Sequence, residues 1–238
     1  MAINTNNNTY TIVYASIVVI VVAFLLAFVS KVLEPQSKAN ERIDKKKQIL
    51  ASLNIRSLQN SDVEAKYAEI VQYDEVINAQ GEVIKSGEKQ DKDGFLVELK
   101  AIRPDQLPVY ICQTEPGIEG TKYVIPLVGK GLWGSIWGYI ALNNDLRTIY
   151  GTYFSHQSET AGLGARITEE WFQQEFIGKQ ISKEGSAQID IKVVKNGKVQ
   201  DAEVECDGIT GATLTSDGVS AMLQDCLTNY KNFLKICD

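Results

Sequence analysis

The chain has 238 residues, of which 44% are hydrophobic and 23% charged, the balance of a globular protein with a buried core. A formal net charge of −6, with no Lys/Arg-rich stripe carrying interleaved aromatics, argues against a nucleic-acid partner. The single histidine, His156, excludes metal sites built from several histidines. The four cysteines form no C-x-x-C pair, so we expect no zinc or iron–sulfur site within the chain, while one disulfide bridge remains open.

An uninterrupted apolar segment near the N-terminus predicts a membrane span. Residues 12–29 carry no charge and, with their flanks, approach the roughly 20 residues that cross a bilayer. A cleaved signal peptide is the alternative. The run exceeds a typical h-region, however, no basic segment precedes it, and no small-x-small cleavage site follows. We therefore expect an N-terminal tail over 1–10 and a retained single-pass transmembrane helix over 11–33.

A helical connector is expected over 34–72. Its first helix, over 38–53, has Asn54 as a stop signal, and Ser61 to Glu64 resemble a capping box that opens a second helix ending near Gln72. Taken alone, the basic residues after the span favour a cytoplasmic C-terminal domain. These residues are Lys31, Lys38, Arg42, Lys45, Lys46 and Lys47.

From residue 73 onward, short β-prone runs alternate with turn residues and then with helical patterns, which predicts a mixed α/β domain over 73–238. The expected strands lie within 75–84 (two runs), 95–99, 109–112, 122–127, 128–142 and 148–155. A helix is expected over 168–177. Residues 189–205 are typical of a β-hairpin around Asn196-Gly197. An amphipathic helix continues to Leu234.

Two glycine-rich loops in this domain carry candidate ligand contacts. The first holds Trp133 and Trp137 between glycines, a pattern that suits either core packing or a planar ligand lying on the backbone. The second, 155–167, places Glu159 and Thr160 next to Gly162 and Gly164 and offers hydrogen-bonding groups on a closely approachable backbone. The lone His156 in that loop is typical of a structural hydrogen-bonding residue.

A third loop, 207–216, concentrates hydroxyl groups directly before the last amphipathic helix. Its sequence is Asp-Gly-Ile-Thr-Gly-Ala-Thr-Leu-Thr-Ser. Such a composition is typical of an ordinary helix cap, with Thr215 or Ser216 as the capping residue. The same glycines, hydroxyls and free amides at a helix start also suit a phosphate group. The loop alone leaves both interpretations open.

Residues 207–213, Asp-Gly-Ile-Thr-Gly-Ala-Thr, resemble the flavinylation motif of the C subunits of sodium-translocating NADH:quinone oxidoreductases. The single span and segments 44–50, 129–133 and 156–164 extend the resemblance over most of the chain. One departure is Ala161, where many relatives carry proline. The G subunits of the ion-translocating ferredoxin:NAD oxidoreductases have the same motif and are the alternative; the 129–133 loop favours the C subunits.

This resemblance implies an FMN-binding domain in which a flavin transferase joins FMN through its phosphate to the hydroxyl of Thr213. It places Asp207, Thr210, Gly211, Ala212, Leu214 and Thr215 around the attachment point. We further expect Trp133, Trp137 and Leu163 to cover the flavin ring, and Glu159, Thr160 and the backbone of Gly162 to Gly164 to hydrogen-bond to it. No catalytic residue and no metal ligand are expected.

The resemblance also implies a function. The chain would be an electron-carrying component of a multi-subunit sodium pump, relaying electrons from NADH toward quinone. No G-x-G-x-x-G follows a predicted strand, so NADH oxidation would belong to another protein of the complex. The domain would lie on the periplasmic side of the inner membrane, since large domains translocate largely regardless of charge. A non-redox domain that binds a phosphate-bearing ligand reversibly is the competing interpretation.

Overall fold

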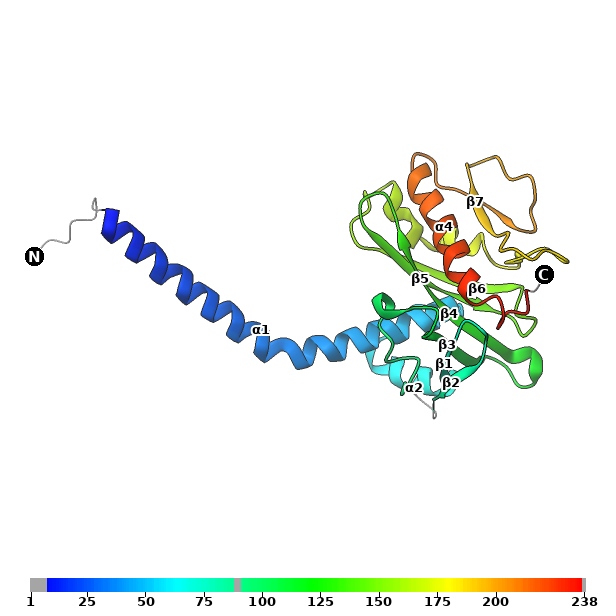
Figure 1. The fold of residues 1–238 in the computed structure, drawn as a ribbon, viewed down its shortest axis with the longest axis horizontal. Helices are drawn as coiled ribbons and strands as arrows, with labels where there is room; N and C mark the ends of the chain where they lie inside the picture. The colour runs from blue at the N-terminus through cyan, green and yellow to red at the C-terminus, as the bar shows by residue number, and fades with distance from the viewer. Residues whose placement is uncertain (1–7, 88–90, 237–238) are drawn as a thin grey trace, which may run out of the picture. The chain divides into compact units, whose positions relative to one another are not determined.

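The structure is a computed structural model that describes residues 8–87 and 91–236 (Figure 1). It divides into two compact units, 1–45 and 46–238, so the division falls inside the predicted connector of 34–72. The predicted membrane span and the helix expected over 38–53 belong to one helix, α1 (Asn8–Ser52), which continues through Pro35. Residues 1–7 of the predicted tail lie outside the described residues.

Helix α1 is long and apolar enough to cross a membrane. Its apolar side chains from Ile12 to Leu33 are exposed in the isolated chain. Burial begins only in its last turns, at Lys46 and from Ile49 to Ser52, which belong to the second unit. Asn54 follows the helix in a left-handed conformation, with φ of +63°, as expected of a residue that stops a helix.

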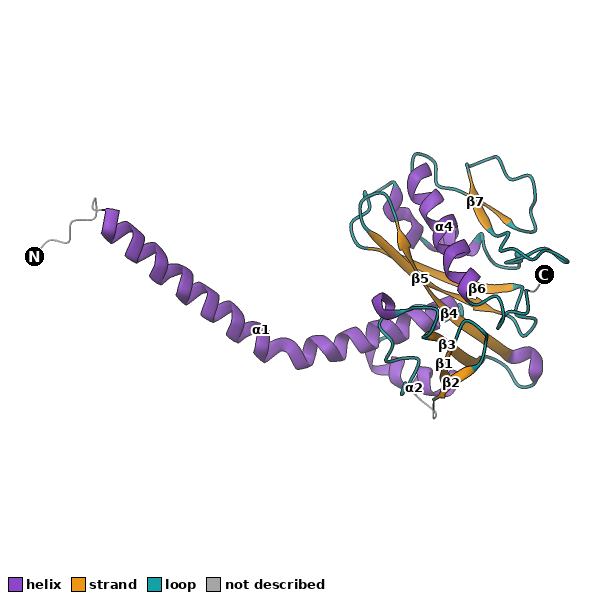
Figure 2. Cartoon of the chain, viewed as in Figure 1, coloured by secondary structure: helices purple, strands orange, loops and turns teal. Residues whose placement is uncertain are grey.

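The second unit is built on one six-stranded antiparallel sheet in the order β2-β1-β3-β4-β5-β6 (Figure 2). The strands are β1 (Val71–Ile77), β2 (Val83–Ser86), β3 (Leu107–Gln113), β4 (Thr121–Lys130), β5 (Ser135–Leu142) and β6 (Ile149–His156). Short 3₁₀ turns lie at η1 (Leu99–Ala101), η2 (Ile118–Gly120) and η3 (Gly164–Thr168).

The strand expected over 95–99 is wrong, because these residues form turns. The cause is the fully buried carboxylate of Asp74, which accepts the backbone N–H groups of Asp93 and Phe95 at 3.1 and 2.5 Å. Those amides are thereby satisfied without a neighbouring strand. The loop is folded back over β1 instead of extending the sheet.

The central strands of the sheet carry buried side chains on both faces, since alternate residues of a strand point to opposite sides. Ile136 and Ile140 of β5 belong to the core cluster that includes Val219 and Met222 of α4 (Thr213–Asn229). Tyr139, between them, packs against Tyr110 on the other face, with ring centroids 6.3 Å apart. That second face also receives α2 (Asn60–Ile70) and the end of α1.

The capping box predicted for α2 does not form. The helix begins after Gln59, which makes no side-chain cap, and the hydroxyl of Ser61 donates to Asp62 instead. The helix expected over 168–177 is also shorter than predicted, with α3 covering Glu170–Gln174. A 3₁₀ turn precedes it, so the apolar pattern there reflects burial of Phe172 and Phe176 rather than a long helix.

The hairpin predicted over 189–205 is wrong. Strands β7 (Lys192–Val194) and β8 (Glu205–Asp207) do pair, but in parallel. Gly197 has a φ of +72°, whereas Asn196 is not left-handed, so the two-residue hairpin turn is not made. Ser220 of α4 instead holds β7, accepting the Val193 N–H at 2.7 Å. The segment between β7 and β8 therefore returns to the end of the pair at which β7 begins, so that β8 runs in the same direction as β7.

Candidate functional site

The 207–212 loop leads from β8 directly into α4, and neighbouring backbone fixes its shape. The Asp207 carboxylate accepts the Gly197 N–H at 2.7 Å, and the Asn196 side chain donates to the Gly208 carbonyl at 3.2 Å. Gly211 adopts a φ of +81°, a conformation that glycine takes without strain. The loop is therefore held in place by the segment between β7 and β8.

Helix α4 begins three to four residues earlier than predicted. Thr213 is its first residue and Ala212 occupies the capping position without a side-chain cap. The prediction that Thr215 or Ser216 caps the helix is wrong, because both lie inside the first turn. The Thr215 hydroxyl donates to the Glu159 carboxylate at 2.7 Å, and the Ser216 hydroxyl accepts the Ile209 N–H at 3.2 Å.

The missing cap leaves donors available at the start of α4. Within the described structure, the backbone N–H groups of Thr213, Leu214 and Thr215 meet no acceptor, and the first backbone bond of the turn runs from the Ser216 N–H to the Ala212 carbonyl at 2.9 Å. Unsatisfied amides and the helix dipole make such an end attractive to anions. A phosphate beside Thr213 fits this arrangement.

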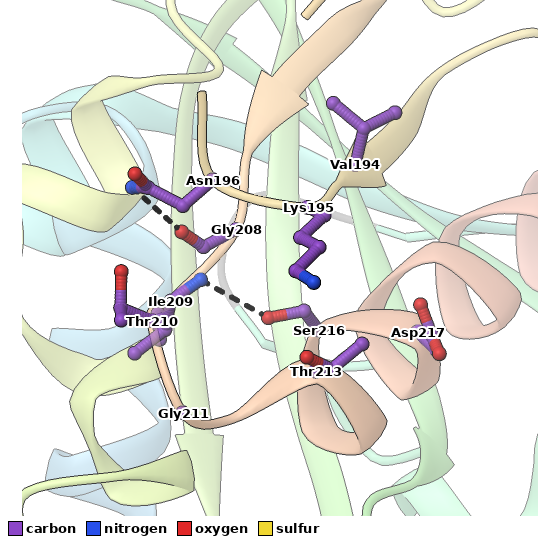
Figure 3. A pocket seen from close by; sticks show the side chains of 10 residues that line it. All are labelled: Val194, Lys195, Asn196, Gly208, Ile209, Thr210, Gly211, Thr213, Ser216 and Asp217. Carbon is purple, nitrogen blue, oxygen red and sulfur yellow. Dashed lines mark hydrogen bonds between the residues drawn. The ribbon is translucent and has the colours of Figure 1, made fainter. Parts of the chain in front are cut away.

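Two pockets lie on either side of Thr213. The first, which we call the lysine pocket, is shown in Figure 3, where Lys195 points toward the first turn of α4. It is lined by Val194, Lys195, Asn196, Gly208, Ile209, Thr210, Gly211, Thr213, Ser216 and Asp217. The second, the glutamate pocket, is lined by Leu132, Glu159, Thr160, Leu163, Gly164, Gly211, Ala212, Thr213, Leu214 and Thr215. Gly211 and Thr213 line both.

Most of the predicted site residues meet in these two pockets, but the tryptophans do not line them. Trp133 is 66% exposed and contributes its backbone N–H to the Glu159 carboxylate at 2.9 Å. Trp137 donates its indole N–H to Gln48 of α1 at 3.3 Å, on the sheet face opposite α4. Trp137 therefore faces away from both pockets, because successive residues of β5 alternate between the two faces and Ile136 and Ile140 face α4.

The remaining predicted residues divide by position. Asp207 is the last residue of β8 and lines neither pocket, and Gly162, with a φ of +76°, directly precedes the pocket residue Leu163. Sequence reasoning missed Leu132, which stands between Gly131 and Trp133 and carried no further signal. It also missed Lys195 and Asn196, because they were assigned to a hairpin turn.

Glu159 is the most enclosed polar group of the site apart from the first turn of α4, being 7% exposed. Burial on its own would raise the pKa of its carboxyl, but hydrogen bonds from the Trp133 amide, the Thr215 hydroxyl and the Gly134 amide outweigh this and lower it. The Glu159 N–H in turn donates to Nδ1 of His156 at 3.2 Å, the structural role expected for that histidine. The site thus contains a fixed carboxylate.

Among residues 8–87 and 91–236, no group of three or more His, Cys, Asp or Glu side chains is arranged to hold a metal ion. Cys112, Cys206 and Cys226 are free thiols, and burial raises the pKa of Cys206 to about 12. Cys237, the fourth cysteine, lies outside the described residues.

Comparisons with known proteins agree on one family. Residues 131–228 match the FMN-binding domain family. The chain is 28% identical to the C subunit of the Na⁺-translocating NADH-quinone reductase of Haemophilus ducreyi, covering 91% of this chain and 88% of that protein. It is 32% identical to the corresponding protein of Chlamydia pneumoniae, covering 80% and 70%.

A solved structure extends this agreement to the fold. The crystal structure of the C subunit from Parabacteroides distasonis is 40% identical and superposes with a TM-score of 0.76, covering 85% of this chain and 96% of that one. Its identity and coverage favour this family over the alternative of a ferredoxin:NAD oxidoreductase component. The chain belongs to the family of C subunits of Na⁺-translocating NADH-quinone reductases.

Proposed function

We propose that this chain carries FMN covalently, through a phosphoester to the Thr213 hydroxyl, and serves as an electron-carrying component of a sodium-translocating NADH:quinone reductase. The observation that carries the proposal is the position of Thr213. It is exposed at the border of the two pockets, whereas the hydroxyls of Thr215 and Ser216 are buried and engaged. Thr210 is also exposed but lines the lysine pocket alone.

The different charges of the two pockets support a proposal for the orientation of the flavin. A phosphodiester carries one negative charge, which favours the free amides at the start of α4 and the Lys195 ammonium. The glutamate pocket holds a buried carboxylate and three exposed leucines, Leu132, Leu163 and Leu214. Apolar side chains of this kind suit the flat face of the isoalloxazine ring. We therefore place the phosphate toward the lysine pocket and the ring in the glutamate pocket.

Attachment requires another protein, because an unassisted threonine hydroxyl is a weak nucleophile. In the proposed reaction a flavin transferase brings FMN as an activated phosphate ester. The Thr213 oxygen bonds to phosphorus and loses its proton, and the leaving group departs with the electrons of the broken P–O bond. Once bound, FMN supplies the electron-accepting chemistry, while this chain positions it and sets its surroundings.

The test is to produce the full chain together with the transferase, denature it, and look for flavin fluorescence on the polypeptide. We expect fluorescence in the wild type and in Thr213→Ser, and complete loss in Thr213→Ala. Thr210→Ala is the matched control, because it removes the other exposed hydroxyl of the loop. Fluorescence that survives in Thr213→Ala and disappears in Thr210→Ala would move the attachment site.

The same experiment separates the redox proposal from reversible binding of a phosphate-bearing ligand. A reversibly bound ligand is lost on denaturation, whereas a phosphoester remains. In the proposed complex, other proteins oxidise NADH, reduce quinone and move sodium, and this chain passes electrons between them. Its relatives are named as components of Na⁺-translocating NADH-quinone reductases.

We also propose that α1 is a retained anchor in the inner membrane and that the second unit lies on the periplasmic side. The length and hydropathy of α1 support the anchor. The lysines that follow the apolar segment favour the opposite orientation, but a large domain translocates largely regardless of such charges. Protease added to intact spheroplasts should degrade the domain. Protection there, with degradation after lysis, would place the domain in the cytoplasm.

A further inference from the structure

The carboxylate of Glu159 accepts hydrogen bonds from two groups of the protein itself. Although it lines the glutamate pocket, one oxygen accepts the Trp133 N–H at 2.9 Å and the other accepts the Thr215 hydroxyl at 2.7 Å. Both oxygens are thus directed to donors of the protein. These two bonds give the carboxylate a role within the protein besides the hydrogen bond that it is expected to accept from the flavin ring.

The structure is built to keep this group enclosed. A Cβ on Gly131 would collide with one carboxylate oxygen, and a Cβ on Gly164 would come within 2.5 Å of both the other oxygen and the Thr215 hydroxyl. Glycine at these two positions lets both loops close around the carboxylate. Glu159 therefore joins three segments that form the pocket: the turn after β4, the 159–164 loop and the first turn of α4.

Among the described residues, no lysine or arginine neutralises the charge of this carboxylate. In the described part of the chain, Glu159 forms no ion pair with a lysine or arginine, and its neighbours are amides, a hydroxyl and His156. Hydrogen bonds stabilise a buried carboxylate without removing its net charge. A ring in the glutamate pocket would therefore lie in the field of a fixed negative charge.

We infer that Glu159 is a positioning residue that holds an unneutralised negative charge beside the flavin ring and thereby lowers its midpoint potential. This inference rests on the proposed function, because it requires FMN in the glutamate pocket. Reduction adds electrons to the ring, and a fixed anion in a poorly solvated site opposes that added charge. Glu159 would set how readily the bound flavin accepts electrons.

Two variants of the flavin-loaded full chain test the charge separately from the packing. Glu159→Gln has the same shape without the charge and should raise the midpoint potential. We expect about tenfold more reduced flavin at a fixed potential, which is about 30 mV for a two-electron couple. Thr215→Val keeps the charge but removes one hydrogen-bond donor from it, so its potential should fall below the wild-type value.

Potentials are read by spectroelectrochemical titration, and thermal denaturation confirms that each variant is folded. A merely structural role predicts the same direction of change in both variants, and that result overturns the inference, as does an unchanged potential in Glu159→Gln. A folded Glu159→Gln chain without flavin also overturns it, because the carboxylate would then act in attachment. If Glu159→Gln does not fold, Thr215→Val decides: a fall supports the inference and a rise contradicts it.

The fluorescence of the denatured wild-type chain tests the proposed function before any midpoint potential is measured. A wild-type chain without covalent flavin fluorescence would contradict attachment at Thr213 before any potential is measured. A wild-type chain with covalent flavin, whose potential is insensitive to the charge at position 159, would contradict only the inference about Glu159.

Discussion

Thr213 and Thr215 stand two residues apart, and the first turn of α4 gives their hydroxyls opposite environments. Thr215 is buried and donates to Glu159, whereas Thr213 is exposed between two pockets. Because successive residues of a helix are rotated by about 100°, a hydroxyl at one position points into the core and one two positions earlier points out. The residue proposed to carry FMN is thus distinguished by its orientation.

The conformation of Gly211 is needed to bring Thr213 to this place. Gly211→Ala puts a Cβ on a residue with φ of +81°, and that Cβ lies 3.1 Å from the Leu163 side chain. The left-handed conformation alone costs about 1 kcal/mol for alanine. We expect a larger loss of unfolding free energy, measured by chemical denaturation, together with less flavin attached to Thr213.

Gly178→Ala is the matched control for this prediction. Gly178 has a φ of +79°, but nothing lies within 4 Å of its added Cβ. It should show the backbone cost of about 1 kcal/mol without the contact and without loss of flavin. Equal destabilisation of the two variants would mean that the Leu163 contact relaxes freely.

At the scale of elements, α4 and the β7–β8 pair depend on each other through Ser220. Its hydroxyl accepts the Val193 N–H at 2.7 Å and lies 3.1 Å from the Val193 carbonyl. Ser220→Ala leaves this buried backbone amide without a partner, which costs about 1–3 kcal/mol. The loss should appear as a lower denaturant midpoint.

Thr228→Ala provides the control on the same helix. Thr228 is exposed and its hydroxyl donates to the Gln224 carbonyl one turn earlier. Such a change should stay within about 0.5 kcal/mol. If Ser220→Ala is equally mild, water replaces the lost hydrogen bond and the tie between α4 and β7 is weak.

Glu205, the first residue of β8, should make the free energy of unfolding depend on pH. Backbone N–H groups of Gln200 and Asp201, followed by Lys192, lower the pKa of Glu205 from 4.5 to about 2. A lowered pKa in the folded state adds stability above the unfolded pKa, and this is lost as pH falls through the folded value. The contribution should therefore be complete above about pH 4.5 and disappear toward pH 2.

Glu205→Gln tests this directly. The variant should unfold at lower denaturant concentration than the wild type at about pH 6, and the difference should shrink as the pH falls from 4.5 to 2. Glu203→Gln changes an exposed neighbour and should show no comparable convergence. A Glu205→Gln difference that is constant over this range would exclude titration of Glu205 as its cause.

Sequence patterns correctly predicted the elements whose formation depends on residues close together in the sequence. The apolar run of α1, most strands of the sheet and the amphipathic spacing of α4 depend on residues near one another. The parallel β7–β8 pair depends on Ser220, and the turn at 95–99 depends on the distant Asp74 carboxylate. Similarly, the motif marked Thr213, but the pairing of Glu159 with Thr215 joins residues 56 positions apart.

At the scale of the whole chain, every buried residue lies at position 46 or later among those the structure describes. The end of α1 contributes to the second unit through Lys46, Ile49 and Leu50. Lys46 is 3% exposed, pairs with Asp91 at 2.8 Å and with Glu64, and lies 4.9 Å from the Tyr67 ring centroid. Removing one partner of such a buried charge group is expected to destabilise the unit.

Two truncations test where the folded unit begins. A chain of residues 44–238 retains Lys46 and should remain in solution after sedimentation of membranes, with the thermal midpoint of the detergent-solubilised full chain. A chain of residues 51–238 lacks Lys46, Ile49 and Leu50. The Asp91 carboxylate then loses its lysine partner, and the core loses the buried side chains of Ile49 and Leu50. Its midpoint should fall by several degrees at least, because a loss of 1 kcal/mol lowers the midpoint of a domain of this size by about 2–4 °C. Equal midpoints for the two truncations would show that the end of α1 adds nothing to the fold, and an unfolded 44–238 chain would show that the first 43 residues are needed for it.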